Sequence, residues 1–191
     1  VGKTETIDYF AAHNYRSVVE INFVEEPKYS AFTADGYGAD TIVRDISLIA
    51  PAKKFIPGDT LIFFDEIQAH PDIVTALKFF KIDGKYDVIC SGSMLGISYK
   101  QIESNSVGYK TDYEMRSLDF EEFLWARGYD EAVIESMFTH LCDATPFSEV
   151  EMNVFTTAFM DYSVLGGMPA VVASHSRTGT VEGTLQLQRQ R

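Results

Sequence analysis

The chain has 191 residues, 46% hydrophobic and 23% charged, so one domain or one domain with a subdomain is expected. Its formal net charge of −12 gives no general attraction for a phosphate backbone, so nucleic-acid binding through a basic face is not supported. No apolar run is long enough to span a bilayer, and Cys90 and Cys142 form neither a metal-binding pair nor a disulfide framework, which favours a cytoplasmic protein without membrane association.

Helical and strand patterns alternate through the first two thirds of the chain. Helices are expected over residues 4–15, around the spaced residues Ile42, Ile46 and Ile49, and after Pro71. Strands are expected over residues 17–23, 60–65, 86–90 and 107–115, with an irregular segment over 27–38. The unbroken apolar run at 60–64 is typical of a strand buried on both faces, and 86–90 is expected to be a second buried strand. This alternation predicts βαβ units and a parallel sheet.

The pattern becomes entirely helical after residue 116. Helices are expected over residues 118–127, 130–141 and 147–162, and a polar helix over 181–191. The run Gly166-Gly167-Met168-Pro169 interrupts this pattern sharply. The sequence therefore divides into an α/β part, residues 1–116, and a helical part, residues 117–191.

The chain opens with Gly2-Lys3-Thr4, the closing half of the phosphate-loop pattern G-x-x-x-x-G-K-[S/T]. In that pattern Lys3 reaches the β- and γ-phosphates, and the hydroxyl of Thr4 coordinates Mg²⁺. The backbone N–H of Gly2 binds phosphate oxygens at the start of a helix. By itself the motif is short, and an exposed terminal lysine is the alternative interpretation of Lys3.

Two carboxylates, Asp65 and Glu66, follow the buried strand predicted at residues 60–65. Ligands bind at the carboxyl ends of strands in open α/β sheets. Asp65 there can hold Mg²⁺ through water, and Glu66 can orient or deprotonate an attacking water, which is the Walker-B arrangement. The alternative is a solvated strand end or the cap of the next helix, and the upstream Gly2-Lys3-Thr4 favours the nucleotide site.

The next strand ends in Ser91-Gly92-Ser93. A polar residue at this strand tip acts as a sensor in many P-loop ATPases, where it hydrogen-bonds the attacking water or the γ-phosphate. Ser91 and Ser93 both qualify, and the sequence does not separate them. A serine-glycine turn that only leaves the strand is the alternative.

With these parts in order, the sequence resembles the prokaryotic ATPases of the AAA superfamily that join a P-loop core to an additional C-terminal domain of poorly defined function. Beyond the motifs above, the resemblance is carried by runs that span nearly the whole chain: Asp65-Glu66-Ile67-Gln68, Leu118-Asp119-Phe120-Glu121-Glu122-Phe123-Leu124 and Gly166-Gly167-Met168-Pro169. It implies binding of ATP with Mg²⁺ and hydrolysis of ATP. It also implies an α/β P-loop NTPase sheet of AAA type followed by an all-helical, lid-like subdomain.

The resemblance further implies that the chain is a fragment. The first strand, most of the phosphate loop and the additional C-terminal domain of the family are expected to lie outside it. Without that first strand, apolar edges around Ile62 and Val88 would be exposed, so we expect residues to precede Val1 in the natural protein.

Other functions remain as alternatives. A catalytically silent interaction or scaffold fragment would keep the fold without binding nucleotide. A GTPase is disfavoured by the Asp65-Glu66 pair and by the lack of an N-K-x-D motif, and a DNA-acting enzyme driven by this core finds no support in the charge. Arg116 is interpreted as a surface residue rather than an arginine finger, and His70 as a helix-start residue rather than a ligand. Self-association and protein partners are left open.

Overall fold

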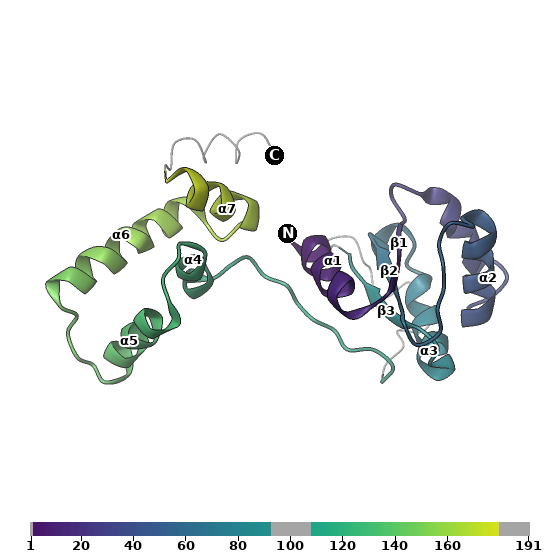
Figure 1. Ribbon diagram of the computed structural model, residues 1–191, viewed down its shortest axis with the longest axis horizontal. Helices are drawn as coiled ribbons and strands as arrows, with labels where there is room; N and C mark the ends of the chain where they lie inside the picture. The colour runs from purple at the N-terminus through teal and green to yellow at the C-terminus, as the bar shows by residue number, and fades with distance from the viewer. Residues whose placement is uncertain (1, 93–107, 180–191) are drawn as a thin grey trace. The chain divides into compact units, whose positions relative to one another are not determined.

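The computed structural model describes residues 2–92 and 108–179, which form two compact units (Figure 1). One unit, Lys3–Tyr113, combines a sheet with helices, and the other contains the helices that follow Glu114. Within the described part of the chain, no helix has both the length and the apolar character that crossing a membrane requires.

The sheet of the α/β unit has three parallel strands in the order β1-β2-β3. These are β1 (Ser17–Asn22), β2 (Thr60–Asp65) and β3 (Asp87–Cys90). All six residues of the central strand β2 are buried, as its unbroken apolar run predicts. The predicted fold class, a parallel sheet flanked by helices as in P-loop NTPases, is therefore confirmed.

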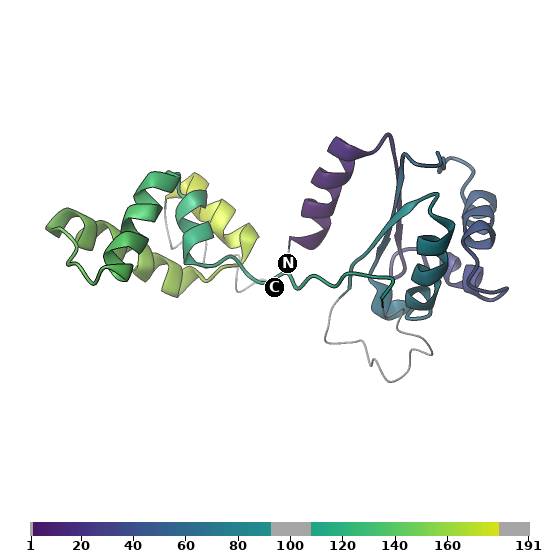
Figure 2. The same cartoon turned by 90° about the horizontal axis from the view of Figure 1, so that it is seen from below.

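Helices cover both faces of this sheet. Figure 2 shows α1 on one face and α2 and α3 on the other. Their bounds are Lys3–Asn14 for α1, Ala39–Ile49 for α2 and Ile73–Asp83 for α3, with short 3₁₀ helices η1 (Pro27–Thr33) and η2 (Ile67–Ala69). Ile62 and Phe64 of β2 pack with Ile42 and Ile46 of α2 and Phe80 of α3 in one core. Side chains alternate along a strand, so Leu61 and Phe63, also fully buried, point to the face that α1 covers.

The strand expected over residues 86–90 is present as β3, but the prediction that it is buried is wrong. Within the described residues β3 pairs only with β2 and lies at a sheet edge, so its side chains are half-buried or exposed. Cys90 still packs against the core, and burial raises the pKa of its thiol to about 12. A thiol held in this way is a structural residue rather than a reactive one.

The prediction of a strand over residues 107–115 is also wrong for the described residues, 108–115. Residue 107 lies outside the described residues, and residues 108–115 contain a turn followed by extended chain without ladder partners. Gly108 has φ 82°, a left-handed conformation that starts a turn. Lys110 Nζ then bonds the carboxylate of Asp112, a local pair 2.6 Å long, and residues 111–117 are exposed. Tyr109 lies under the Lys78 ammonium at 5.5 Å and the Lys110 side chain is only 15% exposed, but residues 111–117 bury no apolar side chain, so they have no packing surface on which to form a strand.

Four helices build the second unit: α4 (Phe120–Ala126), α5 (Glu131–Cys142), α6 (Glu149–Leu165) and α7 (Pro169–Thr178). The first three were predicted, although α4 is shorter and α6 is shifted along the chain. Their starts are set by capping residues, because Asp119, Asp130 and Ser148 each accept a hydrogen bond from the backbone of the first turn. α7 was not predicted, although Pro169 at its first turn is a usual helix start. The helix expected over 181–191 lies outside the described residues.

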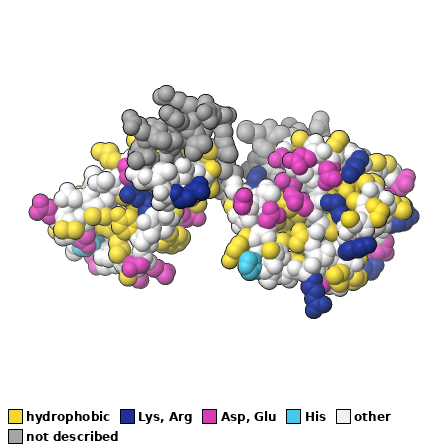
Figure 3. All heavy atoms as spheres, turned by 45° about the horizontal axis from the view of Figure 1, so that its top comes forward, with side chains coloured by type: hydrophobic (Ala, Val, Ile, Leu, Met, Phe, Trp, Pro, Cys, Tyr) yellow, Lys and Arg dark blue, Asp and Glu magenta, His cyan; other side chains and the backbone are white. Residues whose placement is uncertain are grey.

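The surfaces of both units mix charged and apolar side chains (Figure 3). On the helical unit several large apolar residues are exposed, including Leu141, Val150 and Met160. Single exposed apolar residues are normal on soluble surfaces, so these carry no functional conclusion alone.

The Gly166-Gly167 turn closes the helical unit on itself. Gly166 ends α6 with φ 67° and ψ −178°, a region that only glycine adopts readily. The carbonyl of Gly167 accepts a 2.8 Å hydrogen bond from the backbone N–H of Leu118. A Cβ at Gly167 would lie 1.8 Å from the carbonyl oxygen of Leu118, so only glycine fits there. The Tyr162 hydroxyl donates a 2.9 Å hydrogen bond to the carbonyl oxygen of Leu118.

We therefore expect Gly167→Ala to destabilise the helical unit by more than about 2 kcal/mol, because the backbone at Leu118 must move. Trp125, the only tryptophan of the chain, lies in α4 and reports this unit by fluorescence during urea unfolding. Gly179→Ala is the control: Gly179 also has a positive φ, 68°, but open space around its Cβ position, so about 1 kcal/mol is expected. Equal losses in the two variants would contradict the steric explanation.

Candidate functional site

The start of α1 and the carboxyl ends of β2 and β3 meet at one edge of the sheet. Lys3 is the first residue of α1, and its Nζ donates a 2.6 Å hydrogen bond to the carbonyl oxygen of Gly92, just past β3. Thr4 Oγ1 donates to Asp65 Oδ2 at the end of β2, over 3.4 Å. Gly2 precedes α1 with φ 82°, a conformation suited to glycine. The fold thus brings both halves of the predicted site together from 61 positions apart.

Asp65 is held in place by the strand that carries it. Its side chain is only 5% exposed, and Oδ1 accepts a 2.9 Å hydrogen bond from the backbone N–H of Glu66. The other oxygen, Oδ2, receives the hydroxyl of Thr4. A carboxylate on a buried strand, with one oxygen fixed by the backbone, has little freedom to reorient.

Glu66 has an unusual backbone. Its φ of 54° and ψ of 44° are left-handed, and it is one of two described non-glycine residues with positive φ. Such a conformation costs on the order of 1–3 kcal/mol and persists only where the surroundings enforce it. Glu66 follows the last residue of β2, and its left-handed conformation turns the backbone from the strand into η2. The Glu66 side chain therefore does not continue the alternation of the strand.

Of the two serine candidates, the structure describes one. Ser91 is 5% exposed, its backbone N–H bonds the carbonyl of Phe64, and its own carbonyl accepts from the N–H of Ile67. These bonds, 2.8 and 3.1 Å long, tie the tip of β3 to the end of β2 and to η2. Ser91 therefore lies at the site edge, and Ser93 lies outside the described residues.

Gln68 belongs to the same cluster, although the sequence alone gave it no firm role. Its side-chain amide donates to the carboxylate of Glu66. Gln68 and Ile67 also pack so closely on Gly92 that a Cβ there would lie 2.9 Å from an atom of each. Its place in the Asp65-Glu66-Ile67-Gln68 run, two residues after Glu66, was the signal in the sequence.

His70 anchors the segment after η2 in the core and is not a ligand. It lies among the rings of Phe23 and Phe32, and its Nε2 pairs with Thr33 Oγ1 at 2.9 Å. Burial lowers the pKa of this imidazole, which the nearby Asp72 partly opposes. The structure places His70 as the cap that ends η2, not at the start of α3.

The oxygen donors at this edge suit Mg²⁺. Mg²⁺ takes few protein ligands and keeps several waters, with phosphate oxygens completing its shell. The hydroxyl of Thr4 and the carboxylate of Asp65 supply two hard oxygens 3.4 Å apart. In the described part of the chain no three His, Cys, Asp or Glu residues gather as a complete metal cage.

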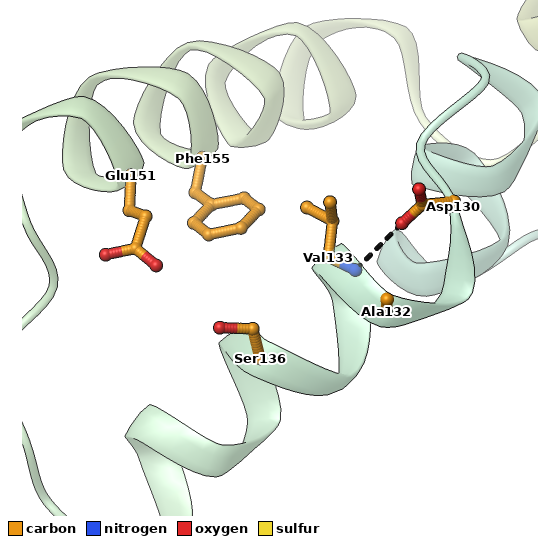
Figure 4. Close-up of a pocket in the computed structure, with 6 residues that line it drawn as sticks. All are labelled: Asp130, Ala132, Val133, Ser136, Glu151 and Phe155. Atoms are coloured by element: carbon orange, nitrogen blue, oxygen red, sulfur yellow. Dashed lines mark hydrogen bonds between the residues drawn. The ribbon is translucent and has the colours of Figure 1, made fainter.

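Another hollow lies within the helical unit. It is a groove of about 340 Å³ between α5 and α6, lined by Asp130, Ala132, Val133, Ser136, Glu151 and Phe155 (Figure 4). Asp130 caps α5 through the N–H of Val133, and Glu151 belongs to the capping box of α6. The pKa of Glu151 is lowered chiefly by its hydrogen bonds with Ser148. Both acidic residues are thus accounted for by helix capping.

The comparison with protein families agrees with this geometry. A family model described as an AAA domain matches residues 1–124, about two thirds of the chain. The chain belongs to the AAA domain family. No curated protein and no solved structure matches it.

Membership of this family indicates a nucleotide-binding domain of ATPase type. The matched residues contain the whole α/β unit and extend into α4 of the helical unit. All the described residues that meet at the sheet edge lie inside the matched range. The AAA domain therefore includes Lys3, Thr4, Asp65, Glu66 and Ser91 together.

The buried His70 predicts a pH dependence of stability. Its pKa is lowered in the folded state, so its contribution is present above its unfolded pKa of about 6.5 and is lost as the pH falls. We expect the urea midpoint, followed by far-UV circular dichroism, to fall between pH 7 and pH 5.5. His70→Gln should flatten this slope, whereas His13→Gln, at an exposed position on α1, should leave it unchanged. An unchanged slope in His70→Gln would contradict the assignment.

Proposed function

We propose that this AAA domain binds ATP with Mg²⁺ and hydrolyses it to ADP and phosphate. The observation that carries the proposal is the pairing of Thr4 with Asp65 at the carboxyl end of β2. Each residue alone has a common alternative explanation, but together they supply the two protein oxygens that P-loop NTPases offer to Mg²⁺. Family membership supports the same class of function.

Three residues at the start of α1 bind the nucleotide in this proposal. The Nζ of Lys3 exchanges the carbonyl of Gly92 for the β- and γ-phosphate oxygens, a charge-assisted and stronger partner. The backbone N–H of Gly2 and those of the first turn face the phosphates, where the positive end of the helix dipole also acts. Thr4 and Asp65 hold Mg²⁺, which neutralises charge on the phosphates.

Glu66 positions or deprotonates the attacking water. Glu66 is the residue next to Asp65, which together with Thr4 binds Mg²⁺ in this proposal. Ser91 or Ser93 contacts the γ-phosphate or that water from the tip of β3. Catalysis of phosphoryl transfer rests on positioning and charge stabilisation, which such fixed polar groups provide.

The helices after residue 116 act as a lid-like region of the ATPase core, residues 1–116, and the nucleotide state drives motion of attached domains. Support comes from the division of the chain into an α/β and a helical unit.

Nucleotide binding is the first test. A fluorescent ATP analogue should bind in the presence of Mg²⁺, and Lys3→Ala should weaken binding about 10- to 100-fold, because a charge-assisted contact to phosphate is lost. Lys81→Ala, at an exposed lysine of α3, is the matched control and should bind normally.

Turnover is the second part of the test. Glu66→Gln should bind the analogue like the native protein but release phosphate at least about 100-fold more slowly, as expected for a lost general base. Glu135→Gln, at an exposed position of α5, should have native turnover. Absence of both binding and turnover in the native protein would favour the alternative of a catalytically silent scaffold.

A further inference from the structure

We propose that Gln68 is a positioning residue for ATP hydrolysis, which holds the carboxylate of Glu66 towards the attacking water. This inference rests on the proposed ATPase function. It adds a residue whose side chain acts through Glu66 and touches neither the nucleotide nor Mg²⁺.

The first observation is the hydrogen bond itself. The Nε2 of Gln68 donates to Oε2 of Glu66, two residues earlier in the chain. Among the described residues, the other oxygen of this carboxylate makes no hydrogen bond. One oxygen is thus held by an amide while the second can accept a proton or a hydrogen bond from water, as a general base requires.

The second observation is the backbone of Glu66. A left-handed residue is held in place by its surroundings, and here the N–H of Glu66 bonds Asp65 while the N–H of Ile67 bonds Ser91. These bonds fix the Cα–Cβ direction of Glu66, but its three side-chain torsions remain to be restrained. The amide of Gln68 is the group that restrains the far end.

The third observation is the confinement of Gln68. Its Oε1 and the Cγ1 of Ile67 both lie 2.9 Å from the position of a Cβ on Gly92, so the amide is packed against that glycine. Gly92 also accepts the hydrogen bond of Lys3. The group that orients Glu66 is therefore packed against the residue that neighbours the phosphate-binding lysine.

The chemical consequence is pre-organisation. A carboxylate free to rotate spends most of its time away from the attacking position, and a misplacement of about 1 Å can cost about 100-fold in rate. Gln68 removes that freedom without adding charge to the site. Its loss should lower the rate of hydrolysis and leave nucleotide affinity unchanged.

Gln68→Met is the decisive variant, because methionine keeps the length and the packing but cannot donate a hydrogen bond. With Mg²⁺ and ATP, we expect kcat to fall about 10- to 100-fold, while the Kd of the fluorescent ATP analogue stays within about 2-fold. Asn153→Met, which removes an exposed amide from α6, is the matched control and should keep native kcat. Thermal unfolding of each variant checks that the fold is kept.

The Glu66→Gln background separates a positioning role from a structural one. If Gln68 acts only through the carboxylate of Glu66, adding Gln68→Met to Glu66→Gln should lower the residual single-turnover rate no further. Gly92→Ala offers an independent route, because its methyl group would push on Gln68 and Ile67, and it should also lower kcat.

A native kcat in Gln68→Met would overturn the inference while leaving the ATPase function intact. A full additive loss in the Glu66→Gln background would overturn it as well, because Gln68 would then act elsewhere. Absence of ATP turnover in the native protein would overturn the proposed function, and the inference with it.

Discussion

The burial of β2 is the constraint on which the rest of the α/β unit depends. Its six residues are buried between β1, β3 and helices on both faces, so the strand cannot shift without opening the core. Asp65 at its end inherits this rigidity, and a carboxylate is kept in a nearly dry position beside a hydroxyl. Burying a carboxylate is costly unless it is hydrogen-bonded or coordinates a metal ion, and a buried carboxylate at a strand end is therefore a candidate for a functional site.

Different elements position the residues that surround the end of β2. The start of α1 brings Thr4 to Asp65, and the left-handed turn at Glu66 sends the chain into η2. The backbone bonds of Ser91 then close β3 against the same point, while the ring of His70 seats the segment after η2 in the core. The polar residues at this strand end are thus supported by the apolar core, and their backbone is fixed, so only their side chains can change conformation.

Much of this could be predicted from the sequence, and the failures have physical causes. The apolar run of β2 and the spacing of Ile42 and Ile46 report burial directly, so the parallel sheet and its helices were predicted correctly. The edge position of β3 depends on which strands pair, and no local pattern contains that information. The strand expected before Met115 is absent because residues 111–117, Tyr113 among them, are exposed and bury no apolar surface. In the site, Asp65 carries a motif, whereas the contact of Gln68 with Glu66 depends on a left-handed turn that the sequence does not reveal.

The central claim is that the edge of the sheet at Thr4 and Asp65 is a site for Mg²⁺ and ATP. The most direct measurement is a crystal structure of the protein with Mg²⁺ and a non-hydrolysable ATP analogue. The account predicts the metal on the Thr4 hydroxyl and on Asp65, directly or through water, and Lys3 turned from Gly92 to the phosphates. A nucleotide bound away from these residues, or a metal that contacts neither Thr4 nor Asp65, would contradict it.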